Sequence, residues 1–465
     1  MNKKIFLVFF FAFVIRLIAI NQSLWLDEAV TAKVVMSYSY TEIINKFSPT
    51  DFHPPLYYLF MKAWTNIFGY SELALRFPSI IFSLLTGYVV YKIASLLHGS
   101  IAGKWAATFF LFNPLIVYYS QEARMYMMAT FFLTVSLFFF LRLSSSNLIG
   151  GSRKLDSRLR GNDKNSLFFG LFISLAFITF YGSIFLIIPM LLYLLFKKKY
   201  TFFILNTLYF TLAALVISPL LYQQIINSKI ALASVTNWSA TLGKANIKNL
   251  LLIPIKFSIG RISFYPKYIY WFISGVWTGS ILYQISKIKN QNDKLKLKNT
   301  HLFYYLLIFP LILGFIVSFF IPMLQYFRFL YLIPIASLLL SFGLLSQPSS
   351  NLRGQILVGG FLIFTLVYLL NPAFHREDWK SLVKDLPKNR PVYMIMSSSD
   401  PIRYYSNNLN IKDLSGQPVE KDINVIPYTS DIHGLDYKSL LSNKGYQLKK
   451  EKSFRELTYE QWSLK

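Results

Sequence analysis

Long apolar runs recur through the first 371 residues of this 465-residue chain and constrain its fold more than any other feature. A helix of about 20 apolar residues crosses a bilayer core about 30 Å thick, and many of the runs approach that length, although several are shorter. A hydrophobic fraction of 54% also exceeds that of ordinary soluble domains. The sequence therefore predicts a mainly α, polytopic membrane domain with eleven transmembrane helices. The runs lie near residues 1–20, 74–97, 101–119, 125–143, 167–180, 183–196, 200–221, 268–286, 302–321, 327–346 and 356–371.

Basic segments between the runs set the expected orientation of the chain. Cytoplasmic loops are enriched in Lys and Arg, so "RKLDSRLRGNDK" (153–164) and "KKK" (197–199) are both placed inside. The chain must then cross twice between them and turn at Tyr181-Gly182, because one continuous helix there would rise about 45 Å. An odd total of spans puts the N-terminus in the cytoplasm. Everything after Asn371 then lies outside the inner (plasma) membrane of a prokaryotic cell.

Two further basic regions need their own interpretation. Segment 144–166 is rich in Ser and Gly without apolar periodicity, and it is expected to be a disordered cytoplasmic loop. Loop 223–267 lies outside in this topology although it carries six Lys or Arg residues and no acid. Either the charge rule is only statistical here, or this loop meets anionic lipid headgroups or a phosphorylated lipid. No nucleic-acid partner is expected despite the net charge of +26, because most basic residues lie in short loops between the runs.

Acidic residues are rare in the membrane part of the sequence and avoid the middle of every run. Only nine of the 21 Asp and Glu residues precede residue 372, and six of these fall in the first two outward loops. Coupled transporters usually bury ionisable groups at the midplane, so this distribution disfavours a lipid or polysaccharide transporter. It favours chemistry at the outer surface, although a non-catalytic envelope protein is a second alternative. The six acids are Asp27, Glu28, Glu42, Asp51, Glu72 and Glu122.

The first outward loop, residues 21–73, is too long to be a simple connector. It contains "LWLDEA" and "DFHPPLYY", in which Pro-Pro enforces a turn before an aromatic cluster suited to the headgroup layer. Arg76, Arg124 and Arg328 stand at outward helix ends, and guanidinium is the side chain best matched to a phosphate. Carboxylates facing water over a ring of arginines predict a site for a lipid-phosphate substrate.

The composition changes at "NPAFHREDWK", where the last long apolar run stops and twelve of the 21 acids follow. "RPVYMIM" and "INVIPY" are predicted to be strands, and "DPIRYYSNN" is predicted to be a turn and the start of a helix. The chain is therefore expected to divide into a membrane domain, 1–371, and a small α/β C-terminal domain, 372–465, on the outside. A module of this size is expected to lean on the membrane domain.

Four motifs in this order resemble the C-type (GT-C) membrane glycosyltransferases of the protein O-mannosyltransferase and aminoarabinose transferase group. They are "LWLDEA", "HPPLYY", "LRFPS" and "YYSQEARMY", with weaker similarity in "YFRFLYLIP" and "REDWK". The resemblance implies many helices, a catalytic Asp in a large first outward loop, and a polyprenyl- or dolichyl-phosphate-linked sugar donor. It gives Asp27 the catalytic place and makes Glu28 its acidic neighbour. The C-terminal domain matches no named acceptor-binding module, so protein, lipid and glycan acceptors all stay open.

The chemistry of the residues agrees with that role. An acceptor hydroxyl that attacks an anomeric carbon loses its proton as the bond forms, and one carboxylate at hydrogen-bond distance can act as general base. The leaving lipid phosphate can be stabilised by arginines, so no acid partner is required. A one-step inverting displacement is predicted, unlike hydrolases that need paired carboxylates.

Each candidate residue also has a structural interpretation. Asp27 can simply cap a helix, and Glu28 points elsewhere if the segment is helical, because successive residues are about 100° apart. Glu122 and Arg124 can pair with each other. No cofactor is expected, although Asp27, Glu122 and His53 are a chemically allowed set of ligands for a divalent ion. Substrate contacts are expected from His53, Tyr57, Arg76, Glu122, Arg124 and Arg328.

Overall fold

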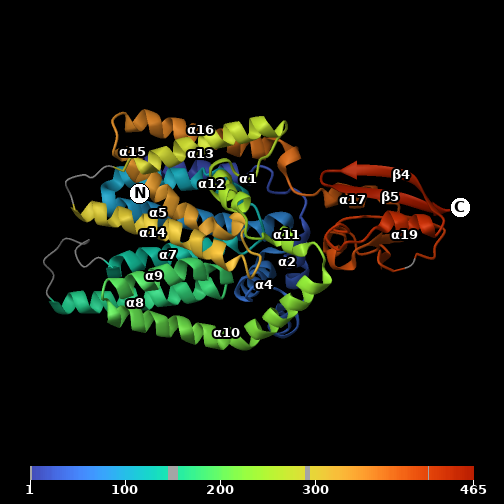
Figure 1. Cartoon of the computed structure of the whole chain (residues 1–465), viewed down its shortest axis with the longest axis horizontal. Coiled ribbons are helices and arrows are strands. Elements are labelled where there is room, and N and C mark those ends of the chain that lie inside the picture. Colours follow the sequence, from blue (N-terminus) through green and yellow to red (C-terminus); the bar gives the residue numbers. More distant parts are fainter. Residues whose placement is uncertain (1–2, 145–154, 289–293, 417) are drawn as a thin grey trace.

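The computed structural model describes residues 3–144, 155–288, 294–416 and 418–465. It shows long helices lying side by side, with a small sheet at one end of the bundle (Figure 1). The α-helices are α1 (Lys3–Leu17), α2 (Leu26–Ser37), α3 (Tyr40–Glu42), α4 (Leu56–Phe68), α5 (Glu72–Leu111), α6 (Pro114–Ser120), α7 (Tyr126–Ser144), α8 (Leu155–Phe177), α9 (Ile184–Phe196), α10 (Tyr200–Ser234), α11 (Trp238–Leu242), α12 (Ile247–Ile259), α13 (Lys267–Ser286), α14 (Lys294–Val317), α15 (Ile333–Leu345), α16 (Ser350–Leu370), α17 (Trp379–Asp385), α18 (Asp400–Tyr405) and α19 (Tyr437–Asn443). Short π- and 3-10-helical segments are η1 (Ile43–Phe47), η2 (Ser48–Thr50), η3 (Tyr181–Ser183), η4 (Tyr326–Leu332), η5 (Pro372–Phe374) and η6 (Met396–Ser398).

Several of these helices are long and apolar enough to cross a membrane, so the chain is a multi-pass membrane protein. Six qualify among the described residues, or seven if the bent pair formed by 100–111 and α6 is one span. The predicted count of eleven is therefore not confirmed, although each apolar run lies on helix. Helices α1 and α9 have only 15 and 13 residues. The orientation derived from that count stays a prediction. The six spans are Glu72–His98, Tyr126–Ser144, Tyr200–Ser234, Thr300–Val317, Tyr326–Leu345 and Ser350–Leu370.

The helices differ in how deeply they are buried. The span formed by η4 and α15 is the most central, with 83% of its apolar window buried, whereas α10 has only 11% buried. The expected break between two apolar runs is present, because η3 separates α8 from α9. The expectation of a disordered loop over 144–166 is wrong for its second part, since α8 begins at Leu155 and helix growth from the apolar run extends into it. Residues 145–154 lie outside the described part.

A kink and a cap place the loop that follows α6. Helix α5 breaks at Gly99, where φ is +85°, a conformation that glycine adopts readily. The Asn113 side chain then caps α6 by accepting from the backbone N–H groups of Leu115 and Ile116. Its Nδ2 donates to the Phe257 carbonyl of α12 at 2.7 Å. These contacts fix the short connection 121–125 between α6 and α7, which carries Glu122 and Arg124.

The C-terminal module, residues 372–465, contains a five-stranded sheet of order β2-β1-β3-β5-β4. Strand β1 pairs in parallel with β2 and β3, whereas β5 pairs antiparallel with β3 and β4. The predicted strands in "RPVYMIM" and "INVIPY" are present as β1 and β3, and α18 begins in "DPIRYYSNN" as expected. The strands are β1 (Val392–Met394), β2 (Ile411–Asp413), β3 (Asp422–Val425), β4 (Tyr446–Phe454) and β5 (Leu457–Leu464).

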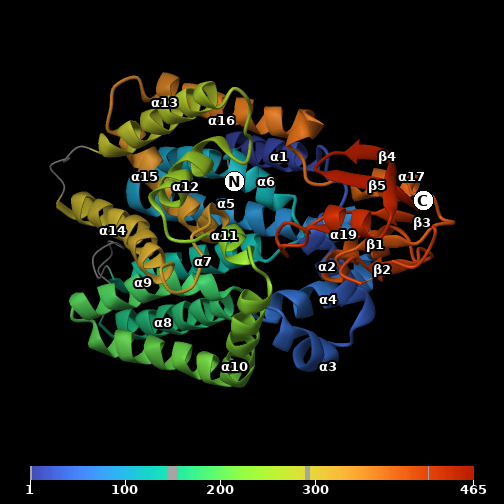
Figure 2. The same cartoon turned by 45° about the vertical axis from the view of Figure 1, so that its right-hand side comes forward.

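The C-terminal module packs against the end of the bundle where α2 and α4 lie (Figures 1 and 2). Its contacts reach the first loop, α5 and the connection before α11. Contacts of Arg376 with the Trp25 ring and of the Lys380 N–H with Ser23 Oγ place the module's N-terminal segment next to the start of α2. The contacts include Lys33 Nζ to Asp400 Oδ1 (2.9 Å), Lys380 Nζ to Glu72 Oε1 (3.0 Å), Tyr404 Oη to the Tyr70 carbonyl (2.8 Å) and Asn237 N to the Ile432 carbonyl (3.0 Å).

Candidate functional site

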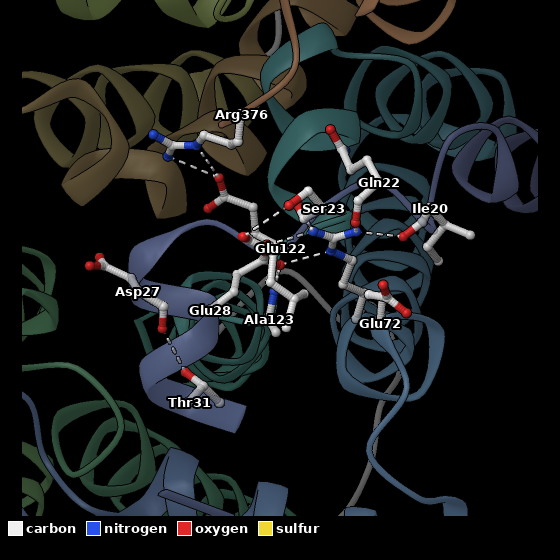
Figure 3. A network of polar contacts seen from close by, with 12 residues as sticks. Ile20, Gln22, Ser23, Asp27, Glu28, Thr31, Glu72, Glu122, Ala123 and Arg376 are labelled. Atoms are coloured by element: carbon white, nitrogen blue, oxygen red, sulfur yellow. Dashed lines mark hydrogen bonds and ion pairs between the residues drawn. The ribbon is translucent and has the colours of Figure 1, made fainter. Parts of the chain in front are cut away.

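The two adjacent carboxylates of "LWLDEA" point in different directions, as helix geometry predicts. Trp25 is extended (φ −90°, ψ 176°) and α2 begins at the next residue, so Asp27 and Glu28 lie in its first turn. The side chain of Asp27 is 38% exposed, whereas that of Glu28 is 1% exposed. Figure 3 shows Asp27 turned away from the network that surrounds Glu28. Only the first of the two carboxylates is accessible to a substrate.

Glu28 is held by a buried bidentate ion pair with Arg76. Its oxygens accept from Arg76 Nε at 2.8 Å and Nη2 at 2.6 Å, and Oε1 also accepts from the Ala123 N–H at 2.8 Å. Arg76 donates its remaining N–H groups to the carbonyls of Ile20, Gln22 and Ser23 at 2.6–3.0 Å. All five guanidinium N–H groups are thus used inside the protein.

These contacts give both residues a structural role, in place of a substrate contact for Arg76 and of a place in the catalytic pair beside Asp27 for Glu28. The carboxylate of Glu28 and the guanidinium of Arg76 are both buried and both satisfied by protein groups. Together they join α2, α5 and the loop at Ala123, and so fix where Asp27 stands. The sequence predicts that Arg76 faces a phosphate. Its buried position, 1% exposed, leaves no donor for one.

Arg124 is the ionic partner of Asp27. Its Nη2 lies 3.5 Å from Asp27 Oδ2, and its Nη1 lies 3.4 Å from the Asp27 carbonyl and 3.5 Å from the Tyr58 hydroxyl. Burial lowers the pKa of Arg124, but Asp27, Tyr58, Tyr126 and Asp51 together raise it by more, so the guanidinium stays charged. These contacts are at the outer limit of hydrogen bonding, so the Asp27 carboxylate is oriented yet still able to accept a proton. Arg124 Nε is buried and has no partner in the described part of the chain.

The alternative that Glu122 pairs with Arg124 is wrong. Glu122 Oε1 instead accepts from Nε and Nη2 of Arg376, at 3.2 and 3.0 Å, and Arg376 belongs to the C-terminal module (Figure 3). Arg376 also lies 3.7 Å from the centre of the Trp25 ring. Burial raises the pKa of Glu122, and Arg376 offsets only part of that rise. The second oxygen, Oε2, is buried without a hydrogen-bond partner among the described residues.

His53 and Tyr57 lie in the same loop but differ in their surroundings. His53 Nδ1 is 3.4 Å from Asp51 Oδ1, and its carbonyl accepts from Gln224, which supports a role in shaping the Pro-Pro turn. Burial raises the pKa of Asp51, but His53, Arg124 and the Phe52 N–H together lower it by more, so its pKa is below the usual range. Tyr57 is 2% exposed, and within the described residues its hydroxyl has no partner.

The allowed metal set of Asp27, Glu122 and His53 is not assembled. Within residues 3–144 and the other described ranges, no group of three His, Asp or Glu side chains could hold an ion. The three residues have separate partners, which are Arg124 for Asp27, Arg376 for Glu122 and Asp51 for His53.

Two arginines near these pairs have no carboxylate partner in the part of the chain that the structure describes. Arg328, in η4, donates to the Pro322 carbonyl at 3.3 Å. Arg261 follows α12 and hydrogen-bonds to the Tyr118 hydroxyl. The guanidinium groups of Arg261 and Arg376 lie 5.3 and 5.7 Å from the centre of the same Tyr118 ring, which places Arg261 close to the Glu122–Arg376 pair. Arg261 belongs to none of the sequence motifs. Its only signal was the acid-free basic loop 223–267.

Arg376 and Glu377 are also part of the site, although the sequence predicts no role for either. Both belong to "REDWK", which carried only weak resemblance. In the structure Arg376 binds Glu122, and Glu377 is buried, 7% exposed, and accepts from the Tyr428 hydroxyl at 2.9 Å. The C-terminal module therefore supplies charged side chains to the site.

Comparison with known proteins agrees with the motifs. Residues 52–223 match the protein family described as dolichyl-phosphate-mannose-protein mannosyltransferase. No curated protein matches the sequence.

Solved structures extend the likeness to nearly the whole chain. ArnT from Cupriavidus metallidurans in the apo state is 11% identical with a TM-score of 0.59, covering 98% of this chain and 97% of ArnT. ArnT bound to undecaprenyl phosphate gives 11% and 0.58, with coverage of 99% and 98%. The Archaeoglobus fulgidus oligosaccharyltransferase AglB, in complex with an inhibitory peptide and a dolichol-phosphate, gives 10% and 0.55, with coverage of 96% and 73%. The chain thus has the fold of ArnT and AglB, and the resemblance seen in the motifs is confirmed by the family match over residues 52–223.

Proposed function

We propose that this protein transfers a sugar from a polyprenyl-phosphate-linked donor to an acceptor hydroxyl at the outer face of the membrane. One observation carries the proposal. Of the two adjacent carboxylates in the first turn of α2, Glu28 is buried in an ion pair with Arg76. Asp27 is exposed to solvent and pairs with the buried Arg124. The match to a mannosyltransferase family and the lipid phosphates bound by ArnT and AglB support a lipid-linked donor.

Asp27 acts as the general base in this reaction. The acceptor oxygen forms a bond to the anomeric carbon while its proton passes to an oxygen of the Asp27 carboxylate. The bond between that carbon and the phosphate oxygen breaks, and polyprenyl phosphate leaves with the electron pair. Because attack and departure occur on opposite sides of the carbon in a single step, the configuration inverts. Arg124, 3.5 Å from Asp27, orients the base through the reaction.

Arg261 and Arg328 hold the donor phosphate. Arg76 and Arg124 are already paired with Glu28 and Asp27, and Arg376 is paired with Glu122. A cation without a carboxylate partner, close to a membrane surface, favours an anionic ligand. A guanidinium also stabilises the charge that develops on the phosphate as it leaves.

Consumption of the donor tests the proposal against its two alternatives. Purified full-length protein in lipid nanodiscs is given a radiolabelled polyprenyl-phosphate sugar and membrane vesicles from cells that lack the protein. A transferase releases polyprenyl phosphate and labels the vesicles, and an inverted linkage in the product supports the one-step mechanism. Donor that stays intact while it moves across a bilayer indicates a transporter. Intact and immobile donor indicates a non-catalytic envelope protein.

A further inference from the structure

Glu377 is a buried carboxylate of which only one oxygen has a hydrogen-bond partner in the described part of the chain. It is 7% exposed, and its Oε1 accepts from the Tyr428 hydroxyl at 2.9 Å. Its Oε2 is also buried, yet it has no hydrogen-bond partner among the described residues. Buried carboxylate oxygens are normally paired, because water can no longer solvate them. An oxygen left in this state requires an explanation.

Another deeply buried carboxylate of the C-terminal module, Glu460, has a hydrogen-bond partner for each of its oxygens. Glu460 is 2% exposed, and its oxygens accept from the Tyr437 hydroxyl and from Trp462 Nε1, each at 2.8 Å. Glu28 in the helical bundle is likewise saturated by Arg76 and the Ala123 N–H. Within the described residues, buried carboxylate oxygens without a partner also occur at Glu122 and Asp51 of the candidate site, but the two structural carboxylates Glu460 and Glu28 are fully paired. Glu377 differs from both.

Glu377 stands where the C-terminal module meets the start of α2. On one side of it in sequence, Arg376 stacks on the Trp25 ring at 3.7 Å. On the other side, the Lys380 N–H donates to Ser23 Oγ at 3.2 Å. The segment that carries Glu377 therefore runs along the residues that lead into Asp27. Burial, Glu377 and, more weakly, Asp27 all raise the pKa of Tyr428, so both carboxylates lie within electrostatic reach of the Tyr428 hydroxyl.

We infer that Glu377 and Trp25 form a subsite for the acceptor, which is a polyhydroxylated glycan group. This inference rests on the proposed function. Glu377 Oε2 lacks a hydrogen-bond donor, and the buried Trp25 Nε1 lacks an acceptor within the described residues. A hydroxyl both donates and accepts, so neighbouring hydroxyls of a sugar ring satisfy the two atoms together. One hydroxyl faces Asp27 and reacts, and its neighbours fix the ring against Glu377 and Trp25.

A peptide acceptor fits this subsite less well. A Ser or Thr residue brings one hydroxyl, and its remaining donors are backbone N–H groups that lie in an extended chain. A sugar ring carries its hydroxyls on adjacent carbons, so a single ring offers one hydroxyl to the base and others to the subsite. A site built to hydrogen-bond an O–H group also rejects analogues that lack it, because its buried polar atoms are then left unpaired. Glu377 is therefore a residue for acceptor specificity and not a second base.

The test compares Glu377→Gln with Asp378→Asn in the full-length protein. Glutamine keeps the shape and one oxygen for Tyr428 but presents an N–H₂ group where the subsite needs an acceptor. Asp378 is the adjacent carboxylate, and its role is to cap α17 by accepting from the Ser381 N–H, which asparagine can also do. Rates are measured against labelled polyprenyl-phosphate sugar and against vesicles from cells lacking the protein.

We expect Glu377→Gln to raise the apparent KM for the vesicles at least tenfold while the donor KM stays within about twofold, and Asp378→Asn to behave like the wild type. Tyr428→Phe should shift the same KM in the same direction, and the double variant should add little, because both changes act on one carboxylate. The label should appear in the glycan fraction of the vesicles.

An unchanged vesicle KM, a change in the donor KM alone, or label found in protein would each overturn the subsite. Absence of donor consumption by the wild type would instead refute the proposed function on which the subsite rests.

Discussion

Asp27 and Glu28 are neighbours in sequence, yet the structure predicts that their amide variants fail in different ways. Asp27→Asn should abolish sugar transfer and leave folding and donor binding close to normal. Glu28→Gln should lose stability first, and any activity it loses should follow from that. The contrast separates a general base from a residue that positions it.

The expected effect at Asp27 is almost entirely kinetic. Its carboxylate is 38% exposed and its ion pair with Arg124 is 3.5 Å long. Loose pairs of this kind contribute about 0–1 kcal/mol to stability. Loss of a general base typically slows a reaction about 100- to 10,000-fold, which corresponds to about 2.7–5.4 kcal/mol in the barrier. Asparagine keeps the shape and hydrogen-bonding capacity of the side chain but cannot take the proton.

The expected effect at Glu28 is mainly thermodynamic. Its carboxylate and Arg76 are each 1% exposed, and the pair is bidentate at 2.6 and 2.8 Å. Removing one partner of a buried pair leaves an uncompensated charge and costs about 3–5 kcal/mol. Glutamine keeps one acceptor oxygen, so the loss should lie near about 3 kcal/mol, the lower end of that range.

The assay measures transfer at saturating donor, donor binding and the midpoint of thermal unfolding on the same purified variants. Glu42→Gln is the control, because Glu42 lies in the same loop and pairs with Lys46 at the surface. An Asp27→Asn variant with more than about a tenth of wild-type activity would leave the mechanism without its base. Loss of donor binding in that variant would make Asp27 a binding residue. A Glu28→Gln variant that is stable yet inactive would exchange the two roles.

Other parts of the structure make their own predictions. Arg261→Lys should raise the donor KM about tenfold and leave the acceptor KM unchanged, because an ammonium cannot reproduce the guanidinium fork. Arg328→Ala should also weaken donor binding more than acceptor binding, and the reverse result would assign either arginine to the other substrate. Burial, with Arg261 and Lys267, lowers the pKa of Lys256 to about 8, so the unfolded chain binds one more proton between about pH 8 and 10.5. Stability should therefore rise with pH across that window, and a Lys256→Met variant that keeps the same rise in thermal unfolding temperature would contradict this assignment. A reporter that is active only in the cytoplasm should stay silent when fused after Lys465, and activity there would contradict the eleven-span topology.

The fold was predictable where the signal is local. Apolar runs gave helices, and the break between α8 and α9 fell where a single helix would have been too long. Strands β1 and β3 carry continuous buried residues and were visible in the sequence. Strand β4 was not, because nearly all of its residues are exposed at the edge of the sheet and "YQLKKEKSF" shows no apolar alternation. Strand β4 forms because it pairs with β5, and that pairing cannot be predicted from the sequence of β4 alone.

The candidate site was predictable only as far as helix geometry reaches. The 100° step between successive residues correctly separated Asp27 from Glu28. The ionic partners are long-range contacts, however. Arg76 lies 48 residues from Glu28, and Arg376 lies 254 residues from Glu122. Proximity within "YYSQEARMY" suggested that Glu122 pairs with Arg124, and that suggestion was wrong because the turn after α6 sends the two side chains to different partners.

The pairing of charges divides the arginines of the site into two kinds. Arg76, Arg124 and Arg376 each face a carboxylate, so they neutralise the acids that build the site and gain little from a further anion. Among the described residues, Arg261 and Arg328 have only neutral partners, a tyrosine hydroxyl and a backbone carbonyl. A phosphate that enters the site would therefore meet two arginines without a carboxylate partner and three whose charge a carboxylate already neutralises. The arginines at outward helix ends look alike in the sequence. The folded chain distinguishes them by their carboxylate partners, and this difference is the basis for proposing Arg261 and Arg328, and not the paired arginines, as ligands of the phosphate.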